Sequence, residues 1–116
     1  MMRRGRLHWA EMDKRRPVLI LSPESRNERA ADLIVVPCST VLREGPWHVR
    51  LARGEGGLAR PSVLLCEQIT TMVKRRIEPE PLGPPITSTR MAEVERAVLL
   101  AIGIIGPPPI DSALGA

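Results

Sequence analysis

Three basic residues, Lys14, Arg15 and Arg16, stand directly before the apolar stretch PVLIL, and their side chains could do chemistry on a phosphate. An arginine presents a planar fork of N–H donors that matches two phosphate oxygens at once, so it can bind a phosphodiester and stabilise added charge on it. A charged turn in contact with solvent is the plainer interpretation of the same run. The residue types alone therefore permit phosphate chemistry without requiring it.

The histidines and cysteines are the other candidates for chemistry. His8 and His48 could form a pair of imidazoles that act as acid and base, because imidazole exchanges protons near neutral pH. Cys38 and Cys66 both lie in apolar runs, which is typical of buried, reduced cysteines, and a disulfide would require that their strands pair. There is no CxxC motif and the histidines are forty residues apart, so we predict no metal site and no cofactor.

The basic charge is concentrated in the first half of the chain. Residues 1–60 hold twelve basic and seven acidic side chains, a net +5, whereas residues 61–116 hold five and six, a net −1; fifteen of the 17 basic residues are arginine. This balance favours a polyanion surface built by the N-terminal half. Trp9 and Trp47 are the only aromatic residues apart from histidine, which disfavours a passive RNA-coating protein, since such proteins stack bases on aromatic platforms.

Short stretches rich in Val, Ile and Leu, separated by turn-forming residues, must position these side chains. They predict five strands, over residues 6–12, 18–22, 33–39, 47–51 and 62–70. A sixth near Ile77 is weakened by nearby prolines, and residues 13–16 are predicted to form a tight charged turn. After Thr87, an N-cap residue, apolar positions recur at helical spacing and predict one amphipathic helix that ends at Gly103 or Gly106.

The length and this order of elements predict one mainly β domain with a C-terminal helix, arranged as a small curled antiparallel barrel. We assign residues 1–106 to the domain and residues 107–116 to a proline-rich, disordered tail. No apolar run approaches the ~20 residues that a membrane-spanning helix needs, and the N-terminus lacks the apolar core of a signal peptide. We therefore expect a cytoplasmic protein without membrane contact.

Six strings occur in a characteristic order: RGRLHWAEMD, RRPVLIL, LIVVPCST, WHVRL, GGLARPSVLLCEQI and MAEVERAVLLAIG. Together, from Arg4 to about Ile104, they resemble the MazF/PemK family of toxin ribonucleases. The resemblance implies an SH3-like barrel related to the toxin CcdB, a symmetric homodimer, and masking by a small MazE-like antitoxin. It also implies metal-independent, sequence-selective cleavage of single-stranded RNA by 2'-hydroxyl attack, which leaves 2',3'-cyclic phosphate and 5'-hydroxyl ends.

The resemblance also assigns roles to residues. Arg16 matches the catalytic arginine, and Ser39 stands where relatives usually have a threonine that hydrogen-bonds the scissile phosphate. Glu67 could assist proton transfer or only orient a nearby arginine, and both roles stay open. The remaining expected RNA-binding residues are Lys14, Arg15, Thr40, Arg43 and Gln68, of which Thr40 is also the fallback for Ser39.

The chain departs from the family pattern at three places. The long glycine-rich loop of many members is cut here to residues 13–15, so an acid that relatives supply from that loop is expected to be missing and the groove to be more open. Leu65 stands where some relatives place a second catalytic arginine, and Thr70 where an arginine often follows the glutamine. These changes affect the expected substrate sequence and rate more than the reaction type.

Two other functions remain open on the sequence. A CcdB-like toxin that binds DNA gyrase would need the fold but not Arg16 and Ser39, and a noncatalytic RNA-binding module would need the charge but not the chemistry. A homodimer is expected under the leading hypothesis for a further reason. Leu99, Leu100, Ile104 and Ile105 widen the apolar face of the predicted helix beyond what one small barrel easily covers.

Overall fold

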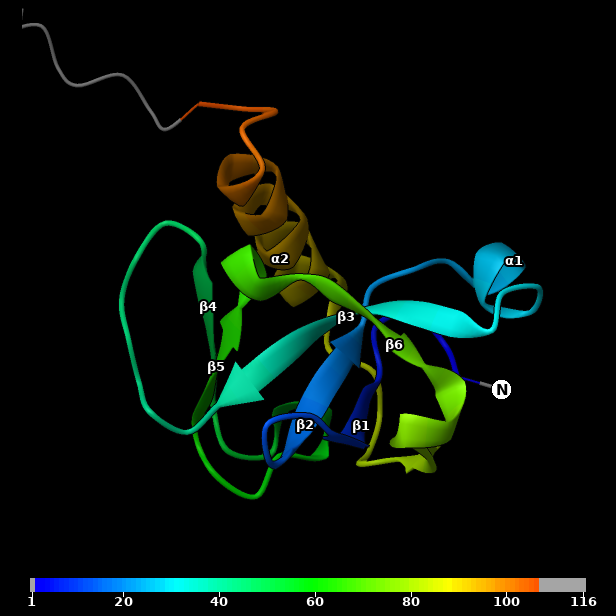
Figure 1. The fold of residues 1–116 in the computed structure, drawn as a ribbon. Helices are drawn as coiled ribbons and strands as arrows, with labels where there is room; N and C mark the ends of the chain where they lie inside the picture. The colour runs from blue at the N-terminus through cyan, green and yellow to red at the C-terminus, as the bar shows by residue number, and fades with distance from the viewer. Residues whose placement is uncertain (1, 107–116) are drawn as a thin grey trace, which may run out of the picture.

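The computed structural model describes residues 2–106, so the predicted tail, residues 107–116, lies outside the described residues. The described chain forms one curled antiparallel sheet with a helix packed on it (Figure 1). The strands are β1 (Leu7–Glu11), β2 (Arg15–Ile20), β3 (Asp32–Ser39), β4 (His48–Leu51), β5 (Ser62–Leu65), β6 (Thr70–Val73) and β7 (Ile77–Pro81). The helices are α1 (Glu24–Asn27) and α2 (Ser88–Ala101), with 3-10 turns η1 (Glu55–Gly57), η2 (Cys66–Gln68) and η3 (Lys74–Arg76).

The strands follow the order β4-β5-β3-β2-β1-β7, and β6 pairs with β3 beside β5. In the described residues β7 does not return to β4, so the sheet curls without closing. The prediction of a mainly β fold with a C-terminal helix is confirmed, whereas the ring of strands that a closed barrel would have is not formed. β3 is the central strand, because its first half pairs with β6 and its end, Cys38 and Ser39, pairs with β5.

Two predicted boundaries were wrong, whereas the sixth predicted strand was confirmed. The long strand over residues 62–70 is broken by η2, because β5 and β6 pair with different halves of β3 and the chain must turn between them. β2 begins at Arg15 rather than Val18, so the charged turn is confined to residues 12–14. The sixth predicted strand does form, as β7, and its prolines are tolerated because β7 lies at an edge of the sheet.

The two faces of the sheet bury separate cores. One core lies under α2 and joins Leu7, Leu19, Val36 and Leu64 to Val94 and Val98 of the helix. The other lies between the first three strands and the β6–β7 segment, and contains Ala10, Val18, Leu33, Val35, Met72 and Ile77. Both faces of β2 are therefore buried, which fixes the position of the strand that begins with Arg15 and Arg16.

The helix α2 begins and ends as its sequence predicts. The Thr87 hydroxyl accepts a hydrogen bond from the Arg90 N–H at 3.2 Å, and Gly103, with φ of +80°, follows the last turn in the left-handed region. Figure 1 shows α2 on the side of the sheet where β4 and β5 lie. No helix in the described part of the chain is long and apolar enough to cross a membrane.

A close backbone contact joins the loop before β5 to the end of β7. Gly57 has φ of +89°, and a Cβ at this position would collide with the carbonyl group of Leu82. Glycine is required both for the left-handed conformation and for the approach. The contact brings Leu58 and Leu82, which are far apart in the sequence, to the same cavity.

Candidate functional site

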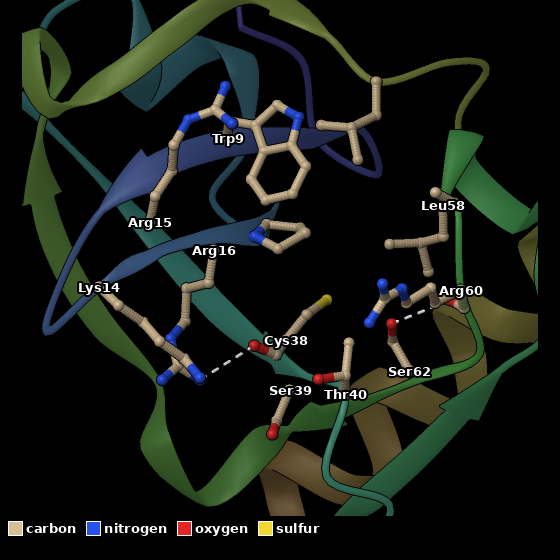
Figure 2. A pocket seen from close by; sticks show the side chains of 13 residues that line it. Trp9, Lys14, Arg15, Arg16, Cys38, Ser39, Thr40, Leu58, Arg60 and Ser62 are labelled. Atoms are coloured by element: carbon tan, nitrogen blue, oxygen red, sulfur yellow. Dashed lines mark hydrogen bonds between the residues drawn. The ribbon is translucent and has the colours of Figure 1, made fainter.

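A cavity of about 390 Å³ lies where the β1–β2 turn meets the end of β3 and the segment before β5. Figure 2 shows Trp9 and Arg15 at one end, Ser39 and Thr40 at the other, and Cys38 between Arg16 and Arg60. Its lining consists of Trp9, Lys14, Arg15, Arg16, Pro17, Cys38, Ser39, Thr40, Leu58, Ala59, Arg60, Ser62 and Leu82. Four cationic side chains beside an apolar surface are suited to an anion that carries a flat, weakly polar group, such as a nucleotide.

Arg16 is a fixed, mostly buried side chain rather than a solvated turn arginine. Its side chain is 14% exposed, and its Nη1 donates to the Cys38 carbonyl at 3.1 Å. Nε and Nη2 donate to the two carboxylate oxygens of Asp13, at 3.1 and 2.7 Å. These bonds use three of the five N–H groups of a guanidinium, which leaves two for a ligand. The hydrogen bond to the Cys38 carbonyl directs the Arg16 guanidinium toward the end of β3.

Asp13 occupies the position on Arg16 that an anionic ligand would take. The hydrogen bond from Arg16 is the main cause that holds the pKa of the Asp13 carboxyl below its ordinary value, so the carboxylate is ionised at neutral pH. Its side chain is 68% exposed, which means that little besides Arg16 holds it. A phosphate could therefore replace Asp13 on the guanidinium at small cost. The shortened loop was expected to lack the acid that relatives supply from it, but its own Asp13 lies next to Arg16.

Ser39 ends β3 at the opposite side of the cavity from Trp9. Its Oγ accepts a hydrogen bond from the Val41 N–H at 3.1 Å, so the oxygen is oriented while the hydroxyl proton stays available for a donor role. Thr40 follows it in the lining of the cavity. The structure thus brings Arg16 and Ser39 together with Lys14, Arg15 and Thr40, as five of the eight predicted site residues.

The other three, Arg43, Glu67 and Gln68, are not part of this lining. Arg43 lies in the exposed β3–β4 loop, and Glu67 and Gln68 form the end of η2. One of the two roles left open for Glu67 was to orient a nearby arginine, but its carboxylate is bonded to His48 Nε2 at 2.8 Å. The His48 side chain is only 10% exposed and its Nδ1 is buried without a hydrogen-bond partner among the described residues.

Sequence reasoning missed the other eight lining residues of the cavity, among them Trp9, Leu58, Arg60 and Leu82. Trp9 was noted only as a scarce aromatic, although the register pairs it with Pro17, one residue after Arg16. The signal that could have revealed Arg60 was the glycine-rich stretch before it, because such loops are enriched near binding sites. Leu58 and Leu82 gave no sequence signal, since the Gly57 contact that joins them is tertiary.

The histidines and cysteines do not form a site of their own. Neither His8 nor His48 lines the cavity, and His8 Nδ1 is bonded to the carbonyl of Glu78 at 2.8 Å. Burial lowers the pKa of His8 below its ordinary value. Cys38 and Cys66 are both free, and burial raises the pKa of each thiol to about 12. Within residues 2–106 no three His, Cys, Asp or Glu side chains gather as they would around a metal ion.

Comparisons with known proteins identify the family to which the chain is similar. Residues 7–102 match the family described as PemK-like, MazF-like toxin of type II toxin-antitoxin system. An endoribonuclease MazF from Staphylococcus saprophyticus is 29% identical over 114 residues, which cover 90% of this chain and 93% of that protein. A solved endoribonuclease in complex with its cognate antitoxin, from a mycobacterial species, superposes with a TM-score of 0.81 at 25% identity over 92% of this chain and 100% of that one. The Mycobacterium tuberculosis toxin MazF-mt6 gives 0.77 at 26% identity, over 84% and 96%.

Proposed function

The chain belongs to the family of PemK-like, MazF-like toxins of type II toxin-antitoxin systems, and on this premise we propose that it is an endoribonuclease that cuts single-stranded RNA. The observation that carries the proposal is that Arg16 and Ser39 line one cationic cavity, each next to the buried part of its strand. A cation fork and a hydroxyl donor on rigid elements are what an anionic transition state requires.

In the proposed reaction the 2'-oxygen of a ribose attacks the adjacent phosphorus and the bond from phosphorus to the 5'-oxygen breaks. The products carry a 2',3'-cyclic phosphate and a 5'-hydroxyl. The nucleophile belongs to the RNA, so no water or metal has to be activated to supply it. Arg16 stabilises the charge that grows on the phosphorane oxygens, and the Ser39 hydroxyl donates a hydrogen bond to one of them.

Two protons must move during this reaction, one from the 2'-hydroxyl and one to the 5'-oxygen. When phosphate replaces Asp13 on Arg16, the released carboxylate would lie close to the reacting group and accept the first proton, while the departing 5'-oxygen takes the second from solvent water. Glu67 remains a predicted proton-transfer group, but its carboxylate would first have to leave His48. Gln68 and Arg43 remain predicted RNA contacts outside the cavity, and Lys14, Arg15 and Thr40 are proposed contacts at it.

Two protein partners belong to the proposal. A second copy of the chain would cover the apolar end of α2, where Ile102 and Ile104 are 53% and 66% exposed. A small acidic antitoxin segment would compete with RNA for the cations of the cavity, as the complex of the mycobacterial relative with its antitoxin suggests by analogy. We place the activity in the cytoplasm, where both RNA and the antitoxin are made.

The test is to incubate the purified protein with long single-stranded RNA in EDTA. We expect discrete fragments with 2',3'-cyclic phosphate and 5'-hydroxyl ends, and sequencing of the 5'-hydroxyl ends would identify the cleavage site. RNA that stays intact while gyrase supercoiling is inhibited would replace the proposal with the gyrase-binding alternative. Sedimentation at micromolar concentration tests the dimer, which a species of only ~13 kDa would contradict.

A further inference from the structure

The Arg15 guanidinium lies over an aromatic ring, although its side chain is half exposed at the protein surface. The centre of its guanidinium stands 4.3 Å from the centroid of the Trp9 ring, a cation–π contact. Its Nε and Nη2 both donate to Oε2 of Glu78, at 2.9 and 2.7 Å. Three strands, β1, β2 and β7, thus supply one residue each to fix a single guanidinium plane.

This fixation makes Arg15 unlike a simple phosphate contact. Two of its five N–H donors are already bonded to Glu78, whose carboxylate partly offsets the charge of the guanidinium. Its side chain is nevertheless 50% exposed. What it offers to a ligand is therefore a flat cationic surface whose rotamer freedom is already reduced, which lowers the entropy cost of binding something flat on it.

The register places this surface beside the candidate catalytic residues but on the other side of the strand. Glu11 pairs with Arg15 and Trp9 with Pro17, so Trp9 and Arg15 lie on one face of the β1–β2 hairpin while Arg16 starts from the opposite face. Figure 2 shows Arg16 directed toward Ser39 and Arg15 directed toward Trp9, at the other end of the same cavity. A chain that leaves a phosphate at Arg16 would pass the Arg15 plane within the cavity.

We propose that the Arg15 guanidinium, backed by Trp9 and held by Glu78, is a stacking platform for one base of the bound RNA, at a nucleotide next to the one whose phosphate contacts Arg16; this inference rests on the proposed function. Unpaired bases stack on guanidinium planes as well as on aromatic rings, and every base has such a face. The platform binds by stacking and tolerates different bases. It supplies the aromatic-type surface that the composition of the chain otherwise lacks.

The experiment combines a protein substitution with removal of one base. The ligand is a single-stranded RNA with 2'-O-methyl at the cleavage position, so that it binds without being cut, and an abasic nucleotide is moved along it one position at a time. For the wild type we expect one abasic position beside the cleavage site to weaken binding by about fivefold to a hundredfold. Arg15→Lys keeps the positive charge but removes the planar guanidinium, so it should weaken binding of intact RNA by a similar factor. In this variant, removal of the base at that position should cause no further loss of affinity (the abasic penalty).

Matched variants separate this result from effects on charge or folding. Arg75→Lys changes an exposed arginine of η3 outside the cavity and should leave the abasic profile unchanged. Glu78→Gln keeps a hydrogen-bond acceptor but weakens the hold on Arg15, and should reduce the abasic penalty partly. Circular dichroism confirms that each variant is folded, which is expected because Arg15 and Glu78 are both surface side chains.

The outcomes distinguish the platform from the proposed function. Cleavage by the wild type with equal abasic penalties in wild type and Arg15→Lys overturns the platform and leaves the nuclease intact. An Arg15→Lys protein that binds RNA as the wild type does would show that Arg15 acts as a charge alone, which also overturns it. Binding with the expected coupling but without cleavage of unmodified RNA supports the platform and overturns the nuclease, and no binding at all overturns both.

Discussion

Two of the acid–base pairs among the described residues have almost the same length, but the acid is 68% exposed in one and 31% exposed in the other. Asp13 meets Arg16 at 2.7 Å, and Glu67 meets His48 at 2.8 Å. The exposed Asp13 can leave Arg16, which then faces a cavity lined by further cations. His48 is buried beside α2 and its pair joins the start of β4 to η2. The comparison teaches that proximity of acid and base does not make a reactive site unless a ligand can replace one partner.

The largest expected effect is on Arg16. If its fork stabilises the phosphorane, Arg16→Ala should slow single-turnover cleavage on the order of a hundredfold to a thousandfold while RNA binding is largely retained. Arg16→Lys should fail almost as badly, because one ammonium cannot make the two-point contact. Quench-flow cleavage and equilibrium binding on the same oligonucleotide measure the two effects. A folded Arg16→Ala protein that cleaves at near the wild-type rate would place the chemistry elsewhere, and Ser39 and the two histidines would be the next residues to test.

Substitution of Asp13 tests whether a phosphate can displace the Asp13 carboxylate from Arg16. Asp13→Asn removes the competing charge, so RNA affinity should rise severalfold, and cleavage of bound RNA should fall if the carboxylate also accepts the 2'-hydroxyl proton. Because Arg16 lowers the pKa of Asp13, the pair contributes stability above the ordinary value of 3.8 and loses it as pH falls through the lowered one. Between pH 5 and 8 the pair should therefore stay intact, and affinity measured across that range should show no step from Asp13. Unchanged affinity in Asp13→Asn would contradict displacement.

The position of Ser39 at the end of β3 could be predicted from the local apolar pattern, whereas Arg16, which the family resemblance singled out, was expected in a turn and lies within β2. The walls of the cavity could not be predicted, because Trp9 and Leu82 reach it through strand register and through the Gly57 contact. The partner of Glu67 was missed for the same reason, since His48 is brought opposite Leu65 by the pairing of β4 with β5. The sequence did not predict the break at η2, because the apolar run continues through it. The turn is required only by the curl of the sheet, which is a tertiary feature.

Substitution of Glu67 should have a small effect on cleavage. A large effect would mean that the Glu67–His48 pair, rather than the Asp13–Arg16 pair, takes part in the reaction. Glu67→Gln keeps the shape and a hydrogen bond to His48 but removes the charge, so cleavage of bound RNA should change by less than about threefold. The partly exposed pair should contribute no more than about 1 kcal/mol to the free energy of unfolding, measured by urea titration. The control is Glu67→Ala with His48→Ala, in which non-additive losses of stability would report the pair itself. A loss of cleavage above tenfold with unchanged binding and stability would instead make Glu67 a catalytic residue.

The smallest expected effect compares one cysteine from each region. Cys38 lines the cavity and its carbonyl accepts from Arg16, whereas Cys66 begins η2 next to Glu67. Burial raises the pKa of both thiols to about 12, so at pH 8 the thiolate fraction should be on the order of a thousandfold below that of an exposed cysteine, and both should resist alkylation in the native protein. Cys38→Ala should leave cleavage within about twofold, because the contact to Arg16 is made by the backbone. If mass spectrometry shows that Cys38 is alkylated readily while Cys66 is not, the cavity beside Arg16 opens far enough to expose the Cys38 thiol to solvent. If both react readily, the core under α2 is less closed than the burial of the two side chains indicates.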